Sequence, residues 1–303
     1  MKGIFLDASD ALADVFDRMV QADDPPIVVN QDDLVPAEAL PSLLEGYDFV
    51  LDDHSYLPTA ALQTCKSLKH VIFLGTGARS YMNPDELAAL GITVHTIKGY
   101  GDVAVAEHTV ALIWAAARGL AAMDREMRGG NWLRTEGVQL RGKTLGLLGF
   151  GGIAAEVATI MGGAGMRVIA WNRTPKQARG VAFVDLDRLL AESDVLSLHL
   201  LLTDETRSFL DTARLAQLRP STILVNTARG ALVDEAALID ALQHGRIAHA
   251  ALDVFDTEPL PAGHPFTTLD RVTLSAHSAF RTPEASDTLI RRALDIAKQV
   301  AAR

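Results

Sequence analysis

A glycine-rich turn near the middle of the chain constrains the fold more than any other feature of the sequence. In TLGLLGFGGIAAEVATIM, Gly149, Gly151 and Ala154 form a G-x-G-x-x-A pattern between an apolar strand and a helix. The first glycine permits a tight turn, the second lets a ligand approach the backbone, and the small third residue lets the helix pack on the strand. The amide groups at the helix N-terminus favour an anion such as a pyrophosphate. The strand–turn–helix setting is what separates this pattern from an ordinary glycine turn, which is the alternative.

Strands and helices alternate on both sides of this turn. Before it, helices are predicted to begin near Ser9, Pro36, Pro58 and Pro84, and apolar runs predict strands at 3–7, 27–30, 49–52, 70–74 and 93–96. A second series begins with the strand that leads into the turn, at 144–149, and continues with strands predicted at 167–171, 195–200, 222–226, 249–254 and 272–275. Such alternation is typical of parallel sheets covered on both faces. Six strands with helical crossovers match a doubly wound nucleotide-binding sheet.

Two domains are predicted from the length and from this order of elements. The chain has 303 residues, and a domain usually has ~100–200. The alanine-rich segment from Asp102 to about Arg128 predicts one long helix, with Gly119 as a candidate break, and a last helix follows Thr282-Pro283. We expect residues 1–98 and 283–303 to form one α/β domain, and residues 99–282 to form a dinucleotide-binding domain inserted in it.

The composition excludes several classes of partner. The formal net charge is −10 and the pI is about 5.3, so nucleic acid and anionic lipid are not expected to bind. Cys65 is the only cysteine, which excludes an intrachain disulfide and a cysteine-based metal cluster, and no metal site is predicted. The N-terminus lacks a signal-peptide layout and the longest apolar stretch, about 109–117, is too short to span a bilayer. We therefore expect a cytoplasmic protein.

The end of the second strand of this second series, at 167–171, bears on the choice of cofactor. An NAD-binding sheet usually carries Asp or Glu there to hold the ribose hydroxyls. This chain has Asn172, Arg173 and Thr174, followed by Lys176. An arginine can pair with a 2′-phosphate that a carboxylate would repel. We therefore favour NADP over NAD; the alternative is that Asn172 starts a turn and Arg173 is a solvated charge.

Three polar residues follow the ends of three later strands: Arg229, Glu258 and His277. Ligands bind such sheets at the carboxyl ends of the strands. A histidine can donate or accept a proton near neutrality, a carboxylate can orient it, and an arginine can hold a substrate carboxylate in an otherwise acidic protein. Singly, each has a structural explanation: a surface ion pair, a proline turn, or a buried histidine. Their convergence on one edge predicts an active site.

With these residues in place, the sequence resembles the D-isomer-specific 2-hydroxyacid dehydrogenases. The resemblance runs from about Gly75 to Ala285 and includes VAEHTVAL, TLGLLGFGGIA, ILVNTARGALVDEAAL, ALDVFDTEPLP and TLSAHSAFRTPEA. It implies a Rossmann nucleotide-binding domain inserted in a smaller flavodoxin-like substrate domain, and a homodimer formed through the long helix. It also implies reduction of a small 2-keto acid to a D-2-hydroxy acid.

The same resemblance implies roles for individual residues. Arg229 would bind the substrate carboxylate, His277 would be the acid/base and Glu258 its partner. Thr76 and Gly77 would contact the substrate. The residues expected at the cofactor are Gly149, Phe150, Gly151, Gly152, Ile153, Asn172, Arg173, Thr174, Thr203, Thr227 and Asp253, with Asp253 bonded to the nicotinamide carboxamide.

Departures from the family pattern narrow the substrate. Asp52 and Asp53 lie where phosphoglycerate-type members often carry an arginine, so we hypothesise that phosphoglycerate is not the substrate and favour glyoxylate or hydroxypyruvate. Thr96 and Lys98 replace a usual asparagine and proline; Lys98 could hold a second anion or be a solvated hinge residue. Two alternatives stay open: a phosphite- or formate-type dehydrogenase, and a non-catalytic protein that senses NAD(P).

Overall fold

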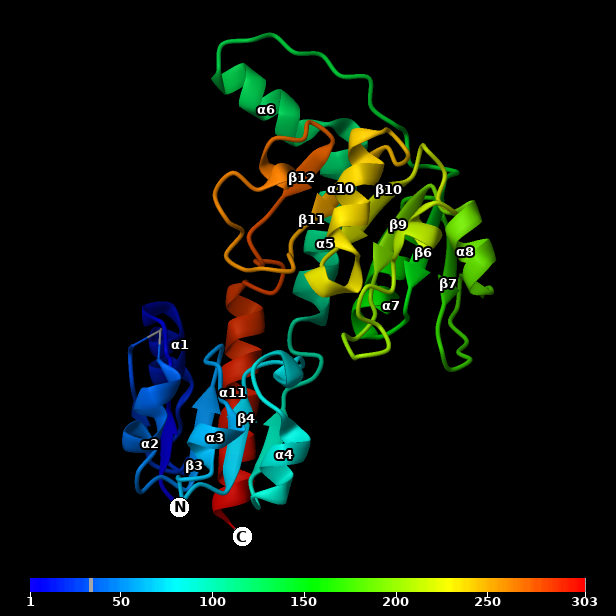
Figure 1. Ribbon diagram of the computed structural model, residues 1–303. Helices are drawn as coiled ribbons and strands as arrows, with labels where there is room; N and C mark the ends of the chain where they lie inside the picture. The colour runs from blue at the N-terminus through cyan, green and yellow to red at the C-terminus, as the bar shows by residue number, and fades with distance from the viewer. Residues whose placement is uncertain (33–34, 303) are drawn as a thin grey trace. The chain divides into compact units, whose positions relative to one another are not determined.

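The computed structural model describes residues 1–32 and 35–302, which divide into two compact units (Figure 1). Unit 1 comprises Met1–Gly101 and Arg281–Arg303, and unit 2 comprises Asp102–Phe280. Arg303, the last residue of the predicted C-terminal segment, lies outside the described residues. Both units are parallel α/β structures, so the predicted fold class is confirmed.

Unit 1 is built on a five-stranded parallel sheet in the order β2-β1-β3-β4-β5. Each strand lies within its predicted range: β1 Gly3–Phe5, β2 Ile27–Val29, β3 Phe49–Asp52, β4 His70–Phe73 and β5 Thr93–Thr96. The central strands are buried on both faces, which explains why they appear in the sequence as continuous apolar runs.

Helices cover both faces of this sheet. They are α1 Asp10–Met19, η1 Ala37–Ala39, α2 Leu40–Leu43, α3 Thr59–Leu62, η2 Ala78–Ser80, α4 Pro84–Ala89 and α11 Pro283–Ala301. The C-terminal helix α11 packs beside α1, and its buried residues Leu289, Ile290 and Leu294 join Phe5 and Phe49 in one core (Figure 1). The Thr282 side chain caps α11 by accepting a hydrogen bond from the Ala285 amide (3.2 Å).

Unit 2 is built on a seven-stranded parallel sheet in the order β12-β11-β10-β9-β6-β7-β8. Its strands are β6 Thr144–Leu148, β7 Arg167–Trp171, β8 Val181–Phe183, β9 Val195–Leu198, β10 Ile223–Asn226, β11 His249–Leu252 and β12 Val272–Leu274. The prediction of six strands was wrong by one, because β8 was missed. This edge strand has three residues and is incompletely buried, so the sequence offers too short a pattern to recognise.

The helices of unit 2 are α5 Asp102–Arg118, α6 Leu120–Arg128, α7 Gly152–Gly163, α8 Leu186–Glu192, α9 Thr212–Leu215, η3 Gly230–Leu232, α10 Glu235–Gln243 and η4 Pro265–Thr267. The predicted long helix is two helices bent by 69° at Gly119, whose φ of 63° is left-handed. Among the described residues, no single helix is long and apolar enough to cross a membrane; the bent pair α5–α6 meets that criterion only when taken together.

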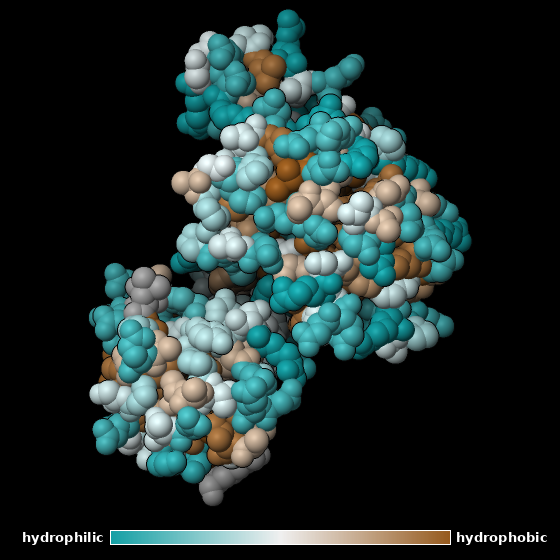
Figure 2. Space-filling model, viewed as in Figure 1, coloured by the Kyte–Doolittle hydropathy of each residue, from teal (hydrophilic) through white to brown (hydrophobic). Residues whose placement is uncertain are grey.

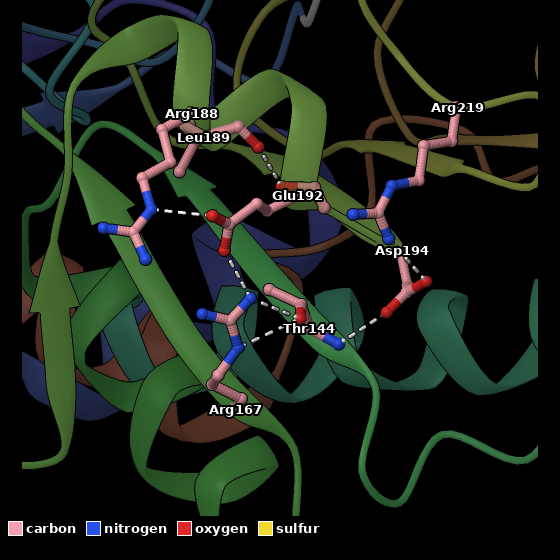
Figure 3. Close-up of polar contacts among 8 residues, drawn as sticks. Thr144, Arg167, Arg188, Leu189, Glu192, Asp194 and Arg219 are labelled. Atoms are coloured by element: carbon pink, nitrogen blue, oxygen red, sulfur yellow. Dashed lines mark hydrogen bonds and ion pairs between the residues drawn. The ribbon is translucent and has the colours of Figure 1, made fainter.

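A polar network ties together the amino ends of the central strands of unit 2 (Figure 3). Asp194 accepts a hydrogen bond from the Thr144 amide (2.8 Å), and Arg167 bonds both the Thr144 hydroxyl (3.0 Å) and Glu192 (2.6 Å). Arg188 adds a second bond to Glu192 (2.7 Å). The charged side chains of this network therefore pair with one another at the amino ends of the strands. The residues of unit 2 that were predicted to be functional follow the opposite, carboxyl ends of these strands.

Candidate active site

The glycine loop after β6 has a shape that fits a bound phosphate group. Gly149 has a φ of 93°, and a Cβ there would lie 2.7 Å from the carbonyl oxygen of His199, so only glycine is tolerated. A Cβ at Gly151 would meet no protein atom within 4 Å, which leaves open space before the first turn of α7. That turn contains no acidic residue of its own and has no side-chain cap, so the amide groups that face Gly151 can serve an anion, while the Asp102 carboxylate of α5 lies against Gly152.

The rest of the loop is held in place by close packing. A Cβ at Gly152 would lie 1.8 Å from Oδ2 of Asp102, the first residue of α5. Ala154 is fully buried, as the small third position of the pattern requires, and Ile153 packs against the same core. The Phe150 ring meets the Phe183 ring edge-on at 5.2 Å. The loop therefore presents backbone rather than side chains to the open space beside Gly151.

The turn after β7 is hydrogen-bonded to the glycine loop. The Asn172 side chain accepts a hydrogen bond from the Phe150 amide (3.0 Å) and donates one to the Thr174 carbonyl (2.7 Å), and Lys176 donates to the Phe150 carbonyl (2.6 Å). Asn172 thus organises a turn, the structural alternative left open above. Arg173 is exposed beside it.

Arg173 has an acidic neighbour. The Thr203 hydroxyl donates a hydrogen bond to Glu205 (2.6 Å). This bond, the Glu205 backbone amide and the charge of Arg173 together lower the pKa of the Glu205 carboxyl. Thr203 and Arg173 therefore belong to one surface region near the glycine loop. Thr227, by contrast, is almost buried, and its hydroxyl shares a hydrogen bond with that of Thr109 (2.8 Å).

The loops after β10 and β11 are in backbone contact at Gly230. A Cβ at Gly230 would lie 1.9 Å from the carbonyl carbon of Phe255, so the two backbones are in direct contact there. Asn226, the last residue of β10, holds its loop by donating to the Arg229 carbonyl (2.8 Å) and accepting from the Ala228 amide (3.0 Å). Gly230 therefore allows the loop of Arg229 to lie against the loop that leads to Glu258.

Glu258 and His277 form a pair. Oε2 of Glu258 lies 2.6 Å from Nδ1 of His277, and Oε1 accepts a hydrogen bond from the Phe255 amide (2.8 Å). Burial raises the pKa of Glu258, but the bonds from His277 and Phe255 and the charges of His277 and Arg229 outweigh it, so the pKa lies below its ordinary value. Both side chains keep about a third of their surface exposed (32% and 29%), which leaves the pair accessible to a small molecule.

Asp253 holds the backbone on which His277 lies. It is fully buried, and its carbonyl accepts a hydrogen bond from the His277 amide (2.7 Å). Its carboxylate accepts from the amides of Ser278 (3.0 Å) and Ala279 (3.0 Å) and from the Ser275 hydroxyl (2.6 Å). Burial raises the pKa of Asp253, but these bonds and His108 hold it well below its usual range.

The interactions around Asp253 include two residues that the sequence did not single out, Ser275 and His108. His108 lies within VAEHTVAL and Ser275 is the first residue of SAHSAF, so both lie inside segments that carry the family resemblance, but no local spacing links them. Their side chains are 2.9 Å apart across 167 residues of sequence.

The expected substrate residues Thr76 and Gly77 lie in unit 1, in the loop after β4. The neighbouring acidic residues differ from one another. Asp7 accepts hydrogen bonds from three amides and from the Ser55 hydroxyl, whereas Asp52 is fully buried and neither of its oxygens has a hydrogen-bond partner. Burial, with the charges of Asp7 and Asp53, raises the pKa of Asp52 well above its ordinary value. The hypothesis of phosphate repulsion therefore rests on Asp53 more than on Asp52.

Lys98 and Thr96 are the remaining departures in unit 1. Thr96 ends β5, and the exposed Lys98 offers its carbonyl to Arg292 of α11 (2.6 Å). The backbone of Lys98 is thereby tied to the C-terminal helix, while its ammonium group lies at the surface.

Comparison with known proteins identifies the family. Residues 110–279 match the family model described as "D-isomer specific 2-hydroxyacid dehydrogenase, NAD binding domain". The chain belongs to the D-isomer specific 2-hydroxyacid dehydrogenase family. This is a family of oxidoreductases that act on the CH–OH group of 2-hydroxy acids with a nicotinamide cofactor. The resemblance inferred from the sequence is therefore confirmed, and the segment matched lies within unit 2.

Two relatives and one solved structure illustrate the similarity. A glyoxylate reductase of Aeropyrum pernix is 45% identical over 226 residues, which cover 70% of this chain and 67% of the relative. A D-3-phosphoglycerate dehydrogenase of Archaeoglobus fulgidus is 36% identical over 242 residues, but they cover only 46% of that longer relative and 78% of this chain. The crystal structure of a glyoxylate reductase from Paecilomyes thermophila has a TM-score of 0.85 and 26% identity, covering 97% of this chain and 93% of the other.

Proposed function

We propose that this chain reduces a small 2-keto acid to a D-2-hydroxy acid, with His277 as the acid/base, Glu258 as its partner and Arg229 binding the substrate carboxylate. The observation that carries the proposal is the 2.6 Å contact between Glu258 and Nδ1 of His277, with the charge of Arg229 near enough to influence Glu258. His277, Glu258 and Arg229 follow three adjacent strands of one sheet, β12, β11 and β10.

The geometry suits proton transfer to a developing alkoxide. Because the Glu258 carboxylate accepts the hydrogen on Nδ1, the opposite ring nitrogen, Nε2, is the atom that delivers a proton to the substrate oxygen. The lowered pKa of Glu258 keeps its carboxylate ionised near neutrality, so it stabilises the protonated imidazole rather than competing for the proton. The Arg229 guanidinium pairs with the substrate carboxylate and polarises the adjacent carbonyl. When bound, the nicotinamide cofactor supplies the hydride.

Glyoxylate and hydroxypyruvate are the substrates we favour. The acidic group of Asp53 and Asp7 lies in unit 1 near the end of β3, where a substrate phosphate would be repelled. The relative with the highest identity quoted above is a glyoxylate reductase, whereas the phosphoglycerate dehydrogenase matches over less than half of its length.

NADP is the cofactor we favour over NAD. The position that usually carries a ribose-binding carboxylate is occupied by Asn172, whose amide is committed to the turn and to the Phe150 backbone. Arg173 and Lys176 bring two positive charges to the same turn. A 2′-phosphate placed there would meet cations and no carboxylate from that strand end.

We also propose that the chain is a cytoplasmic homodimer, with no nucleic-acid or membrane partner. Large apolar side chains are exposed along α5, α6 and the segment that follows, including Val103, Leu120, Met127 and Trp132. Figure 2 shows a hydrophobic patch that reaches the surface among hydrophilic residues in the α6 part of unit 2. Trp132 is 75% exposed, and burial against a second copy would remove this apolar surface from water.

A cofactor-by-substrate screen tests the proposal. NADPH and NADH are each combined with glyoxylate, hydroxypyruvate and pyruvate, and the loss of nicotinamide absorbance is followed for the wild type and for His277→Ala. We expect oxidation of NADPH to exceed that of NADH with glyoxylate or hydroxypyruvate, and to collapse in the variant. In parallel, phosphite and formate are each combined with NADP+ and NAD+; oxidation of either one, with no turnover of any keto acid, would refute the proposal in favour of the alternative dehydrogenases. Cofactor binding without any turnover would favour a sensing role.

A further inference from the structure

A chain of hydrogen bonds runs from helix α5 to the loop of His277. Ser275 Oγ lies 2.6 Å from Asp253 Oδ1, and His108 Nε2 lies 2.9 Å from the same Ser275 Oγ. His108 Nε2 is also 3.4 Å from Asp253 Oδ1. The three side chains come from α5, from the end of β11 and from the end of β12, and all belong to unit 2.

The direction of this chain follows from the donor and acceptor capacity of its members. A carboxylate only accepts, so the single hydroxyl hydrogen of Ser275 points to Asp253. Ser275 Oγ must then accept from His108, which places a hydrogen on Nε2 of His108. The order is His108 Nε2–H to Ser275 Oγ–H to Asp253 Oδ1, and each link fixes the orientation of the next.

Asp253, whose orientation Ser275 fixes, in turn holds the backbone of His277. Through its main-chain carbonyl and its carboxylate, Asp253 binds the amides of three consecutive residues, His277, Ser278 and Ala279. His277 has a φ of 47°, a left-handed conformation that a residue with a Cβ adopts only when its surroundings impose it. The amide bonds to Asp253 are the contacts that impose it, and the ring of His277 reaches Glu258 from this conformation.

We propose that His108 is a positioning residue of the active site, acting through Ser275 and Asp253 on the backbone that carries His277. Its donor group holds Ser275 in the orientation that serves Asp253, and its side chain, 27% exposed, is hydrogen-bonded to Ser275 rather than to Glu258 or His277. This inference rests on the proposed role of His277, and it adds a residue 169 positions earlier in the sequence to the same reaction.

Variants at two positions test the connection. His108→Ala removes the donor, Ser275→Ala removes the relay, and His108→Gln restores an amide N–H near the position of Nε2. The matched control is His244→Ala, because His244 is an exposed histidine at the C-terminal cap of α10 whose side chain bonds to Asp240 of that helix. Thermal unfolding of each variant establishes that the fold is kept.

Kinetics give the first result. We expect kcat for the favoured keto acid to fall by roughly 10- to 100-fold in His108→Ala and in Ser275→Ala, as small misplacements of a reacting group do. Because both act on one path, the double variant should be no slower than the slower single variant. His108→Gln should recover most of the rate, and His244→Ala should match the wild type. The proposal would be overturned if the fold-losses in kcat of the two single variants multiplied in the double variant, or if His108→Gln failed to restore kcat.

Histidine NMR separates this inference from the proposed function. With isotope-labelled histidine, the His277 ring signals should shift or broaden in His108→Ala and Ser275→Ala, return in His108→Gln, and stay unchanged in His244→Ala. Unchanged His277 signals in His108→Ala would overturn the positioning role whatever the enzyme turns over. If the signals respond as expected but the wild type reduces no keto acid, the positioning stands and the proposed function is wrong.

Discussion

Asp52 makes the stability of unit 1 depend on pH in a direction unusual for a carboxyl group. The side chain is fully buried, and neither oxygen has a hydrogen-bond partner. Burial first, then the charges of Asp7 and Asp53, raises its pKa well above the ordinary value of 3.8. The folded chain therefore keeps a proton that the unfolded chain releases, so stability falls as pH rises from the unfolded pKa towards the raised folded one.

The magnitude follows from proton linkage. Over the window between the two pKa values, one such group lowers the free energy of unfolding by about 1.4 kcal/mol for each pH unit. Asp52→Asn has nearly the same shape but no proton to lose. Relative to the wild type, the variant should therefore gain about 1.4 kcal/mol per pH unit through that window, and its melting temperature should rise by a few degrees.

Urea unfolding of both proteins at several pH values between about 5 and about 8 measures this difference. The matched control is Asp14→Asn on α1, where the carboxylate is exposed, so the same substitution is made without removing a buried acid. The reasoning is refuted if Asp52→Asn loses stability relative to the wild type as pH rises, or if the difference between them is constant.

Three further predictions concern the site. His277→Ala should lower kcat by about 10²- to 10⁴-fold with the cofactor dissociation constant nearly unchanged, as measured by steady-state kinetics and nicotinamide fluorescence titration. Arg229→Lys should lower kcat/KM by about 10- to 100-fold, because one ammonium cannot replace a planar two-point contact, and an unchanged KM would contradict that contact. Gly151→Ala should leave the melting temperature unchanged, since its Cβ meets no protein atom, yet weaken cofactor binding on the order of tenfold. The equivalent change at Gly149 should instead destabilise the protein, because its Cβ would strike the His199 carbonyl.

The sequence was sufficient to predict the fold class and nearly all the strands. Buried parallel strands need apolar side chains on both faces, so β3 and β6 appear in the sequence as mainly apolar runs, apart from Asp52 and Thr144. The edge strand β8 escaped notice because three partly exposed residues carry no such signal. The candidate helix break at Gly119 is confirmed, although the sequence did not decide between a break and a continuous helix, since glycine also occurs inside helices.

The candidate site was only partly predictable, because some of its contacts join residues that are distant in the sequence. Arg229, Glu258 and His277 follow strand ends, and one topological rule brings such positions to one edge. The contact of Gly230 with Phe255 and the bond of His108 to Ser275 depend on pairs that are distant in sequence. No local pattern encodes them.

Asp52 at the end of β3 and Asp253 after β11 show that residue type alone does not give the charge state of a buried carboxyl group. Asp52 and Asp253 are both fully buried aspartates at the carboxyl ends of strands. Asp253 is surrounded by donors and has a lowered pKa, whereas Asp52 has none and its pKa is raised. The sequence presents both as negative charges beside a ligand. Hydrogen-bond donors at Asp253 make it a stable anion that organises the loop of His277, and their absence at Asp52 favours a neutral carboxyl that costs stability as pH rises.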